Sequence, residues 1–163
     1  MGNMKQGSLA TGSGNTLEQT VTGTLLSKGF TIVNYGEYIK KKHNYGEELL
    51  IKNVPYKTIY GHNGKTEFLL ISRTYSLEVR IECKWQQASG SVDEKYPYLY
   101  LNCIEAMPER DIIIIIDGGG AKEGSIKWLK KAAEDHAYTS NKTKNIKIFN
   151  LVEFVKWANT TFR

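Results

Sequence analysis

Charged and apolar residues alternate along Leu77–Trp85, which reads LEVRIECKW. This alternation predicts a strand with one face in the core and Glu78, Arg80, Glu82 and Lys84 on the other face. An acid two residues before a lysine on one strand face places a carboxylate beside an ammonium group. Metal-dependent phosphodiester hydrolysis uses both groups. The pattern also fits a surface hairpin with cross-strand ion pairs, so the neighbouring strand has to decide between these interpretations.

The preceding apolar segment supplies that neighbouring strand. A turn at residues 74–75 predicts an antiparallel pairing that places Phe68 opposite Ile81, an apolar pair. In the same register Glu67 lies opposite Glu82. Opposed side chains have Cβ atoms about 5 Å apart, where like charges are destabilising. Two carboxylates at this separation need a cation or a shared proton, which favours a metal site.

The chemistry of the predicted patch suits magnesium. Mg²⁺ takes oxygen ligands, usually one or two carboxylates together with waters and substrate phosphates. We predict that Glu67 and Glu82 bind Mg²⁺ together with the backbone carbonyl of Cys83, and that Mn²⁺ substitutes for it. Lys84 would hold the attacking water or neutralise the transition state. The register also places Lys65 opposite Lys84.

These residues resemble the core of the PD-(D/E)XK nuclease superfamily, in which an acid on one strand precedes a (D/E)-x-K triplet on the next. Glu67, in KTEFLLI, matches the first acid, and Glu82-Cys83-Lys84 matches the triplet. The sequence departs from the pattern at two points: the first acid is Glu instead of Asp, and Thr66 stands where proline is expected. The resemblance implies a metal-dependent nuclease that cuts double-stranded DNA.

The resemblance extends over roughly residues 15–117. It makes Glu18, on a predicted first helix, the candidate auxiliary acid. Gln86 follows the triplet as K-x-Q and is a candidate to orient the water or contact phosphate. The segment SGSVDEK at residues 89–95 resembles type II restriction endonucleases and phage nucleases of the superfamily. The implied fold is the restriction endonuclease-like core, with the order αβββαβ.

The remaining pattern predicts an α/β fold with a central mixed β-sheet flanked by helices. Residues 1–14 are rich in Gly and Ser and predict a flexible N-terminal arm, followed by a single domain over 15–163. A hairpin is expected with Asn63-Gly64 in its turn, because this dipeptide favours tight turns. The other predicted elements are a helix from residue 15 or 16 to 28, a strand at 30–35, a variable excursion at 38–56, a helix from near Pro97 to about 107, a buried strand at 112–116, a helix at 123–136, a strand at 146–149 and a helix at 151–162.

Composition narrows the classes of partner. A net charge of +5, from 22 basic and 17 acidic residues, favours a polyanion such as DNA. No apolar run approaches the roughly 20 residues that a membrane helix needs, so we expect a cytoplasmic protein without a membrane partner. Cys83 and Cys103 are expected to be reduced thiols, and neither they nor the three histidines have zinc-ligand spacing.

Several alternatives stay open at this point. The chain is interpreted as a restriction endonuclease that forms a homodimer, or as the small cleavage subunit of a heterodimer with a larger DNA-recognition subunit. A structure-specific nuclease of Holliday junction resolvase type and a non-catalytic DNA-binding module on the same fold are the rivals. The glycine loop Gly118–Gly120 suggests a nucleotide site, although the G-x-x-x-x-G-K-[ST] pattern is not met. Asp117 before it is a candidate polar contact or helix cap.

Overall fold

The computed structural model describes residues 4–88, 90 and 93–163, with side chains from residue 16 onward. Within these residues a mixed sheet has the strand order β1-β2-β3-β4-β5-β6. The β2–β3 and β3–β4 pairs are antiparallel, whereas β1–β2, β4–β5 and β5–β6 are parallel. The strands are β1 (Thr31–Asn34), β2 (Glu48–Lys57), β3 (Asn63–Ser72), β4 (Leu77–Trp85), β5 (Asp111–Asp117) and β6 (Asn145–Phe149).

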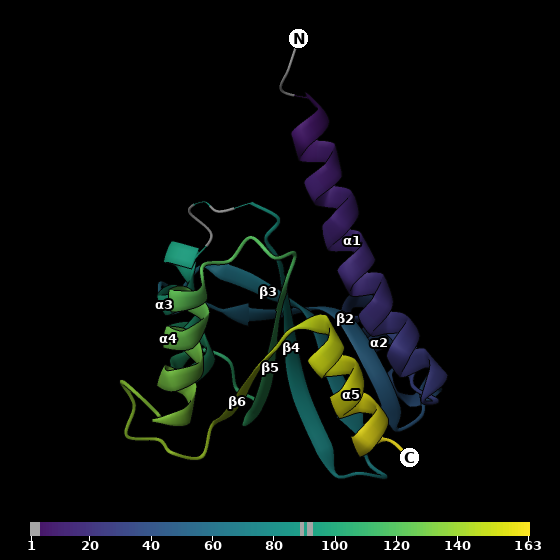
Figure 1. Cartoon of the computed structure of the whole chain (residues 1–163). Helices are drawn as coiled ribbons and strands as arrows, with labels where there is room; N and C mark the ends of the chain where they lie inside the picture. The colour runs from purple at the N-terminus through teal and green to yellow at the C-terminus, as the bar shows by residue number, and fades with distance from the viewer. Residues whose placement is uncertain (1–3, 89, 91–92) are drawn as a thin grey trace.

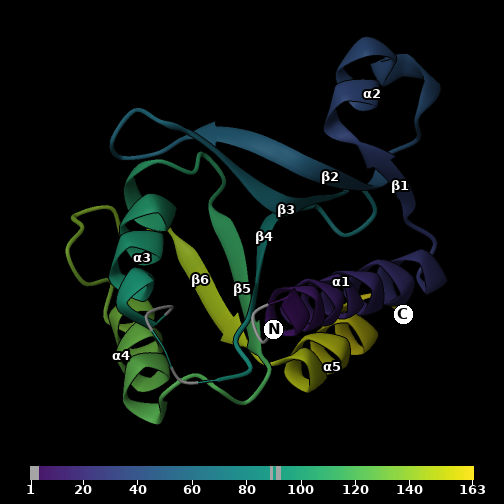
Figure 2. The same ribbon diagram turned by 90° about the horizontal axis from the view of Figure 1, so that it is seen from above.

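Helices cover both faces of this sheet (Figures 1 and 2). Helices α1 (Met4–Ser27) and α5 (Leu151–Thr161) lie side by side on one face, and α3 (Tyr96–Glu105) and α4 (Glu123–Glu134) lie on the other. The short helix α2 (Tyr35–Lys40) follows β1 at one edge of the sheet. The architecture confirms the predicted α/β fold. In the described part of the chain, none of the helices is long and apolar enough to cross a membrane.

Two apolar layers fix these helices to the sheet. On the α1 and α5 face, Val21 and Phe154 pack in one cluster with Ile81 of β4. On the opposite face, Tyr100 of α3 packs in a second cluster with Ile114 of β5. Both isoleucine side chains are fully buried. Neighbouring positions on β5 alternate between the two layers, since Ile113 belongs to the first cluster and Ile114 to the second. The predicted buried strand is therefore a central strand of the sheet.

The predicted register of the β3–β4 hairpin is confirmed. Phe68 pairs with Ile81, and Ser72 pairs with Leu77 at the turn end of the hairpin. The Ser76 N–H donates to the Arg73 carbonyl across the turn, at 3.1 Å. The apolar pairing selected this register from the sequence because a shift of one residue would expose the whole buried face.

The turn of the β2–β3 hairpin is not at Asn63-Gly64, so that prediction was wrong. Asn63 already pairs with Lys57 as the first residue of β3. The turn lies before it, where Gly61 has a φ of +74°. Gly64 serves packing instead, because a Cβ there would lie 3.0 Å from the Tyr56 ring.

Two further segments differ from the sequence prediction. Helix α1 begins at Met4, well before the predicted start near Asn15. The division into an arm over residues 1–14 and a single domain over 15–163 stays a prediction. The excursion expected at 38–56 contains β2, which pairs with both β1 and β3. Pro55 is tolerated in β2 because β1 pairs only with residues 49–52, which leaves one side of β2 unpaired at Pro55.

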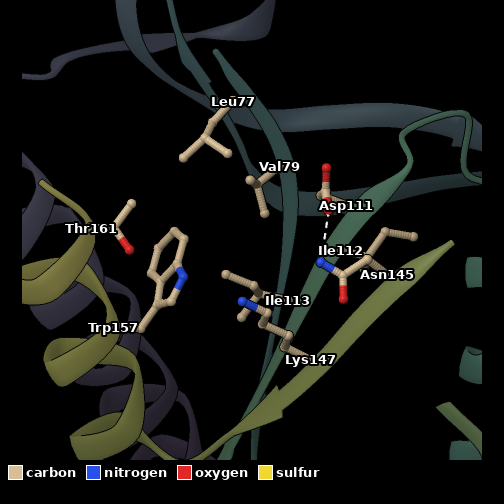
Figure 3. Close-up of a pocket in the computed structure, with 9 residues that line it drawn as sticks. All are labelled: Leu77, Val79, Asp111, Ile112, Ile113, Asn145, Lys147, Trp157 and Thr161. Atoms are coloured by element: carbon tan, nitrogen blue, oxygen red, sulfur yellow. Dashed lines mark hydrogen bonds between the residues drawn. The ribbon is translucent and has the colours of Figure 1, made fainter. Parts of the chain in front are cut away.

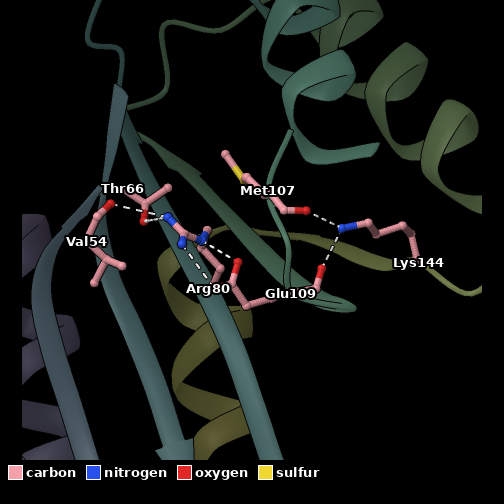
Figure 4. A network of polar contacts seen from close by, with 6 residues as sticks. All are labelled: Val54, Thr66, Arg80, Met107, Glu109 and Lys144. Carbon is pink, nitrogen blue, oxygen red and sulfur yellow. Dashed lines mark hydrogen bonds and ion pairs between the residues drawn. The ribbon is translucent and has the colours of Figure 1, made fainter. Parts of the chain in front are cut away.

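A buried ion pair joins three strands beneath the hairpin (Figure 4). The Arg80 guanidinium of β4 donates to both carboxylate oxygens of Glu109, from Nε at 2.5 Å and from Nη2 at 3.0 Å. Its Nη1 donates to the Val54 carbonyl and to the Thr66 hydroxyl. The Lys144 ammonium group then donates to the Glu109 carbonyl at 2.7 Å. Arg80, expected on a charged strand face, is therefore a buried structural residue.

Candidate active site

The site begins where the β3–β4 pairing ends. The pairing stops at Phe68 and Ile81, and the next residue toward the start of β3 is Glu67. The Cys83 N–H donates to the Glu67 carboxylate at 2.7 Å. The Glu67 side chain thus accepts a hydrogen bond that a backbone carbonyl of β3 would accept in a regular pair of strands. This contact holds the Glu67 carboxylate against β4.

Glu82 and Lys84 complete the group from the next strand. The Lys84 ammonium lies 2.5 Å from one carboxylate oxygen of Glu82. The Glu82 side chain is 7% exposed and that of Lys84 is 35% exposed, so the pair lies between core and solvent. The second oxygen of Glu82, Oε2, is buried without a hydrogen-bond partner in the described residues. A buried acceptor of this kind is costly unless a further donor or cation reaches it.

The two carboxylates influence each other electrostatically. Burial, and then the charge of Glu82, raises the pKa of Glu67 to about 7. Burial also raises the pKa of Glu82, although Lys84 and Arg80 oppose the change. Burial by itself would lower the pKa of Lys84, but the Glu82 carboxylate more than offsets this and the pKa is raised. Lys84 is therefore cationic at neutral pH, while the two acids repel each other.

The chain matches a known family over nearly its whole length. The family model that matches is described as a PD-(D/E)XK nuclease superfamily domain, and it covers residues 9–162. The chain belongs to the PD-(D/E)XK nuclease superfamily. The predicted resemblance is thereby confirmed, and the match extends past the region that carried it. A search of curated proteins gives no match.

Membership in the superfamily implies nuclease activity in general, usually with divalent metals, and DNA as the substrate. Among the residues that the structure describes, no three His, Cys, Asp or Glu side chains gather closely enough to hold a metal ion by themselves. Two acids nevertheless fit Mg²⁺, which keeps several waters and substrate oxygens as ligands. The unpartnered Oε2 of Glu82 is an acceptor that such a cation would satisfy.

The two residues predicted to assist, Gln86 and Glu18, come from different parts of the fold. Gln86 is buried directly after β4, where its amide oxygen accepts from the Tyr96 hydroxyl at 3.1 Å and its Nε2 has no partner among the described residues. Glu18 belongs to α1, and its charge acts on Cys83, the middle residue of the triplet. Burial chiefly raises the pKa of the Cys83 thiol, and the charges of Glu67, Glu18 and Glu82 raise it further. Lys65, by contrast, is exposed and pairs with Pro55 of β2.

The glycine loop after β5 supports Gln86. The Gly120 N–H donates to the Gln86 carbonyl at 2.7 Å, and a Cβ at Gly118 would lie 2.4 Å from the same carbonyl oxygen. A Cβ at Gly120 would lie 2.5 Å from the Ala88 nitrogen. Close backbone packing therefore accounts for these glycines without a nucleotide. Asp117 accepts from the Leu151 N–H at the start of α5, at 2.9 Å, which matches the predicted capping role.

Sequence reasoning missed the cavity above the two catalytic candidates. The cavity has a volume of about 280 Å³, Glu82 and Lys84 line it, and the tyrosines Tyr56, Tyr96 and Tyr98 form much of its wall. The sequence signal was the cluster of tyrosines in YPYLY, which favoured core packing. Tyr96 is indeed buried, but Tyr98 is partly exposed. Residues 89, 91 and 92 of the SGSVDEK segment lie outside the described residues.

A second cavity, of about 230 Å³, lies at the other end of the sheet (Figure 3). Val79, Ile113 and the Trp157 ring line it, and Figure 3 shows the Trp157 ring pointing toward it from α5. Val79 pairs with Asp111 at the start of β5, whereas Lys84 pairs with Ile116 near its end. None of the predicted site residues lines this second cavity.

The raised pKa of Glu67 predicts that the metal-free protein loses stability as the pH rises. The unfolded chain releases this proton near pH 4.5 and the folded chain near pH 7, so unfolding becomes easier across that interval. The corresponding free energy is about 3 kcal/mol. The Glu67→Gln side chain does not titrate, so the free energy of unfolding of this variant relative to wild type should increase between pH 4.5 and 7. Urea unfolding in EDTA at several pH values measures this difference.

The control is the same measurement with saturating Mg²⁺. Bound cation favours the ionised carboxylates, so it should stabilise wild type more at pH 8 than at pH 5 and Glu67→Gln little at either pH. Parallel pH profiles for the two metal-free proteins would show that Glu67 is an ordinary surface acid.

Proposed function

We propose that the protein is a Mg²⁺-dependent endonuclease that hydrolyses phosphodiester bonds in DNA. The observation that carries the proposal is the position of Glu82. Its buried carboxylate contacts the Lys84 ammonium and interacts electrostatically with a second acid, Glu67, and one of its oxygens has no partner among the described residues. A purely structural ion pair would not need the second acid, because Glu67 raises the electrostatic cost of the site.

The proposed roles follow from these contacts. Glu67 and Glu82, with the backbone carbonyl of Cys83, bind the cation. Bound Mg²⁺ supplies positive charge to the scissile phosphate and acidifies the attacking water. Lys84, which is cationic and partly exposed, holds the water or neutralises the charge that develops on the phosphate. Gln86, directly after β4, orients the attacking water or contacts the phosphate. Glu18 of α1 is the auxiliary acid.

The biological setting of the reaction is also part of the proposal. The favoured interpretation is a type II restriction endonuclease, acting as a homodimer or as the cleavage subunit beside a larger DNA-recognition subunit. A resolvase-type nuclease is the second candidate, because the same two acids and lysine would serve cleavage of branched DNA. A non-catalytic DNA-binding module is disfavoured by the charged group around Glu82.

The test compares DNA substrates under defined metal conditions. Purified protein is incubated with supercoiled plasmid, linear duplex and a four-way junction, in Mg²⁺, in Mn²⁺ and in EDTA. We expect cutting in either metal and none in EDTA. Preference for the plasmid and linear duplex supports the restriction interpretation, and preference for the junction supports the resolvase interpretation.

Binding measurements settle the case in which no DNA is cut. Affinity for DNA that is independent of Mg²⁺ and unchanged in Lys84→Ala would indicate the non-catalytic module. Affinity that rises with Mg²⁺ in wild type but not in Glu82→Gln would instead indicate a cleavage subunit that needs its partner. Sedimentation of the free protein distinguishes a homodimer from a monomeric subunit.

A further inference from the structure

The cavity above Glu82 and Lys84 has the lining of a site for a planar ring. Tyr56 of β2 forms one wall, and Tyr96 and Tyr98 at the start of α3 form another. Burial, and then the Glu82 charge, raises the pKa of Tyr56 to about 12, so its hydroxyl keeps its proton and is able to donate a hydrogen bond. The cavity therefore offers aromatic surfaces and a polar edge beside the proposed catalytic group.

The rim of this cavity carries a stacked aromatic pair. The rings of Tyr60 and Tyr98 have centroids 5.1 Å apart and planes inclined by 23°. Tyr60 lies at the tip of the β2–β3 hairpin and is 68% exposed. A tyrosine in such an exposed position adds little to the stability of the fold. The Ile59 N–H donates to the Asn102 side chain of α3 at 2.9 Å, which fixes the hairpin tip against α3 (Figure 2). The Tyr60–Tyr98 pair is therefore held in a fixed position on the surface.

Two lysines also belong to the lining of this cavity. They are Lys84 and Lys95, and Lys95 is the more exposed of the two. Aromatic rings alternating with cationic groups are the usual means of binding single-stranded nucleic acid, because rings stack on bases and lysines contact phosphates. A paired base inside a duplex has no free face for such a ring, since its neighbours cover both faces.

We propose that the cavity and the Tyr60–Tyr98 stack bind an unpaired nucleotide of the substrate, next to the phosphate that is cut. The inference rests on the proposed nuclease function and adds the substrate class: DNA with a base that is unpaired or turned out of the helix. Lys84 then serves the scissile phosphate and Lys95 the adjoining one. A bulge supplies such a base without the cost of turning it out of a duplex, so the enzyme cuts beside a bulge faster than within a continuous duplex of the same sequence.

Three end-labelled oligonucleotides of one sequence test this substrate class. They are a fully paired duplex, the same duplex with a single-nucleotide bulge, and the single strand. Wild type should cut beside the bulge about tenfold faster than it cuts the paired duplex. Tyr98→Ala and Tyr60→Ala should bring the two rates close together, and Tyr98→Phe, which keeps the ring, should retain the preference. Tyr138→Ala, which removes a tyrosine that is 72% exposed, is the matched control and should behave as wild type.

Each outcome bears on the inference separately from the proposed function. Equal rates on paired and bulged DNA, or a preference that survives both alanine variants, would overturn the inference while leaving the nuclease intact. If wild type cuts none of the three, the chain does not act as a nuclease on its own, and fluorescence anisotropy in EDTA becomes the readout. About tenfold tighter binding to bulged DNA, lost in Tyr98→Ala, would support the nucleotide site, and equal affinities would overturn it.

Discussion

Lys84→Ala is expected to lower the rate of DNA cleavage by about 10²–10³-fold, because one preorganised charge at a developing negative charge has an effect of this size. The variant removes the cation that lies 2.5 Å from the Glu82 carboxylate. It also leaves Glu82 with less opposition to the rise in its pKa that burial causes. The rate constant for plasmid nicking at saturating protein and Mg²⁺ measures the loss.

Two matched variants separate chemistry from charge. Lys65→Ala removes an exposed lysine from the neighbouring strand and should change the rate by less than about threefold, because isolated surface charges contribute little. Lys84→Arg keeps the charge but replaces a compact ammonium with a planar fork, so it should recover only part of the rate. A Lys84→Ala protein that cuts at the wild-type rate would remove Lys84 from the mechanism.

Arg80→Met is expected to lower the free energy of unfolding by about 3–5 kcal/mol, because it leaves the buried Glu109 carboxylate without its partner. The side chains of Arg80 and Glu109 are 3% and 5% exposed, so water cannot replace the lost contacts. The variant also removes the donor to the Val54 carbonyl, which ties β2 to β4. Urea unfolding at pH 7 measures the change, provided that the m-value stays constant.

The double variant Arg80→Met with Glu109→Leu is the control for this pair. Replacing both charges with apolar side chains removes the unpaired charge, so most of the lost stability should return. The Val54 carbonyl and the Thr66 hydroxyl still lack the Arg80 donor, which should leave a deficit of about 1 kcal/mol. If Arg80→Met costs less than about 1 kcal/mol, the pair is solvated in solution and does not hold the three strands together.

The sequence was most informative where local pattern and pairing act together. The alternating apolar residues of the β3–β4 hairpin allowed one register, and Phe68 pairs with Ile81 as that register requires. From it follow the proximity of Glu67 to β4 and the common strand face of Glu82 and Lys84. The hydrogen bond from the Cys83 N–H to Glu67 was not foreseen, because it depends on the strands separating beyond Phe68.

Long-range partners lay beyond the reach of the sequence. Arg80 resembled its charged neighbours on the strand, and nothing in its local pattern marks Glu109, which arrives from the segment after α3. The cavity had the same limitation, because its wall combines Tyr56 of β2 with Tyr98 of α3. The Asn63-Gly64 prediction failed for a related reason: Gly61, two residues before Asn63, adopts the left-handed conformation that the turn requires.

Close packing between the glycine loop and the end of β4 limits which substitutions the chain tolerates. Any side chain at Gly118 or Gly120 would collide with the backbone of residues 86–88, and those residues carry Gln86 beside the site. The two segments therefore constrain each other, and a side chain at either glycine is tolerated only if the backbone of residues 86–88 moves. A replacement loop that carries side chains at these two positions would therefore displace Gln86 from its place after Glu82 and Lys84.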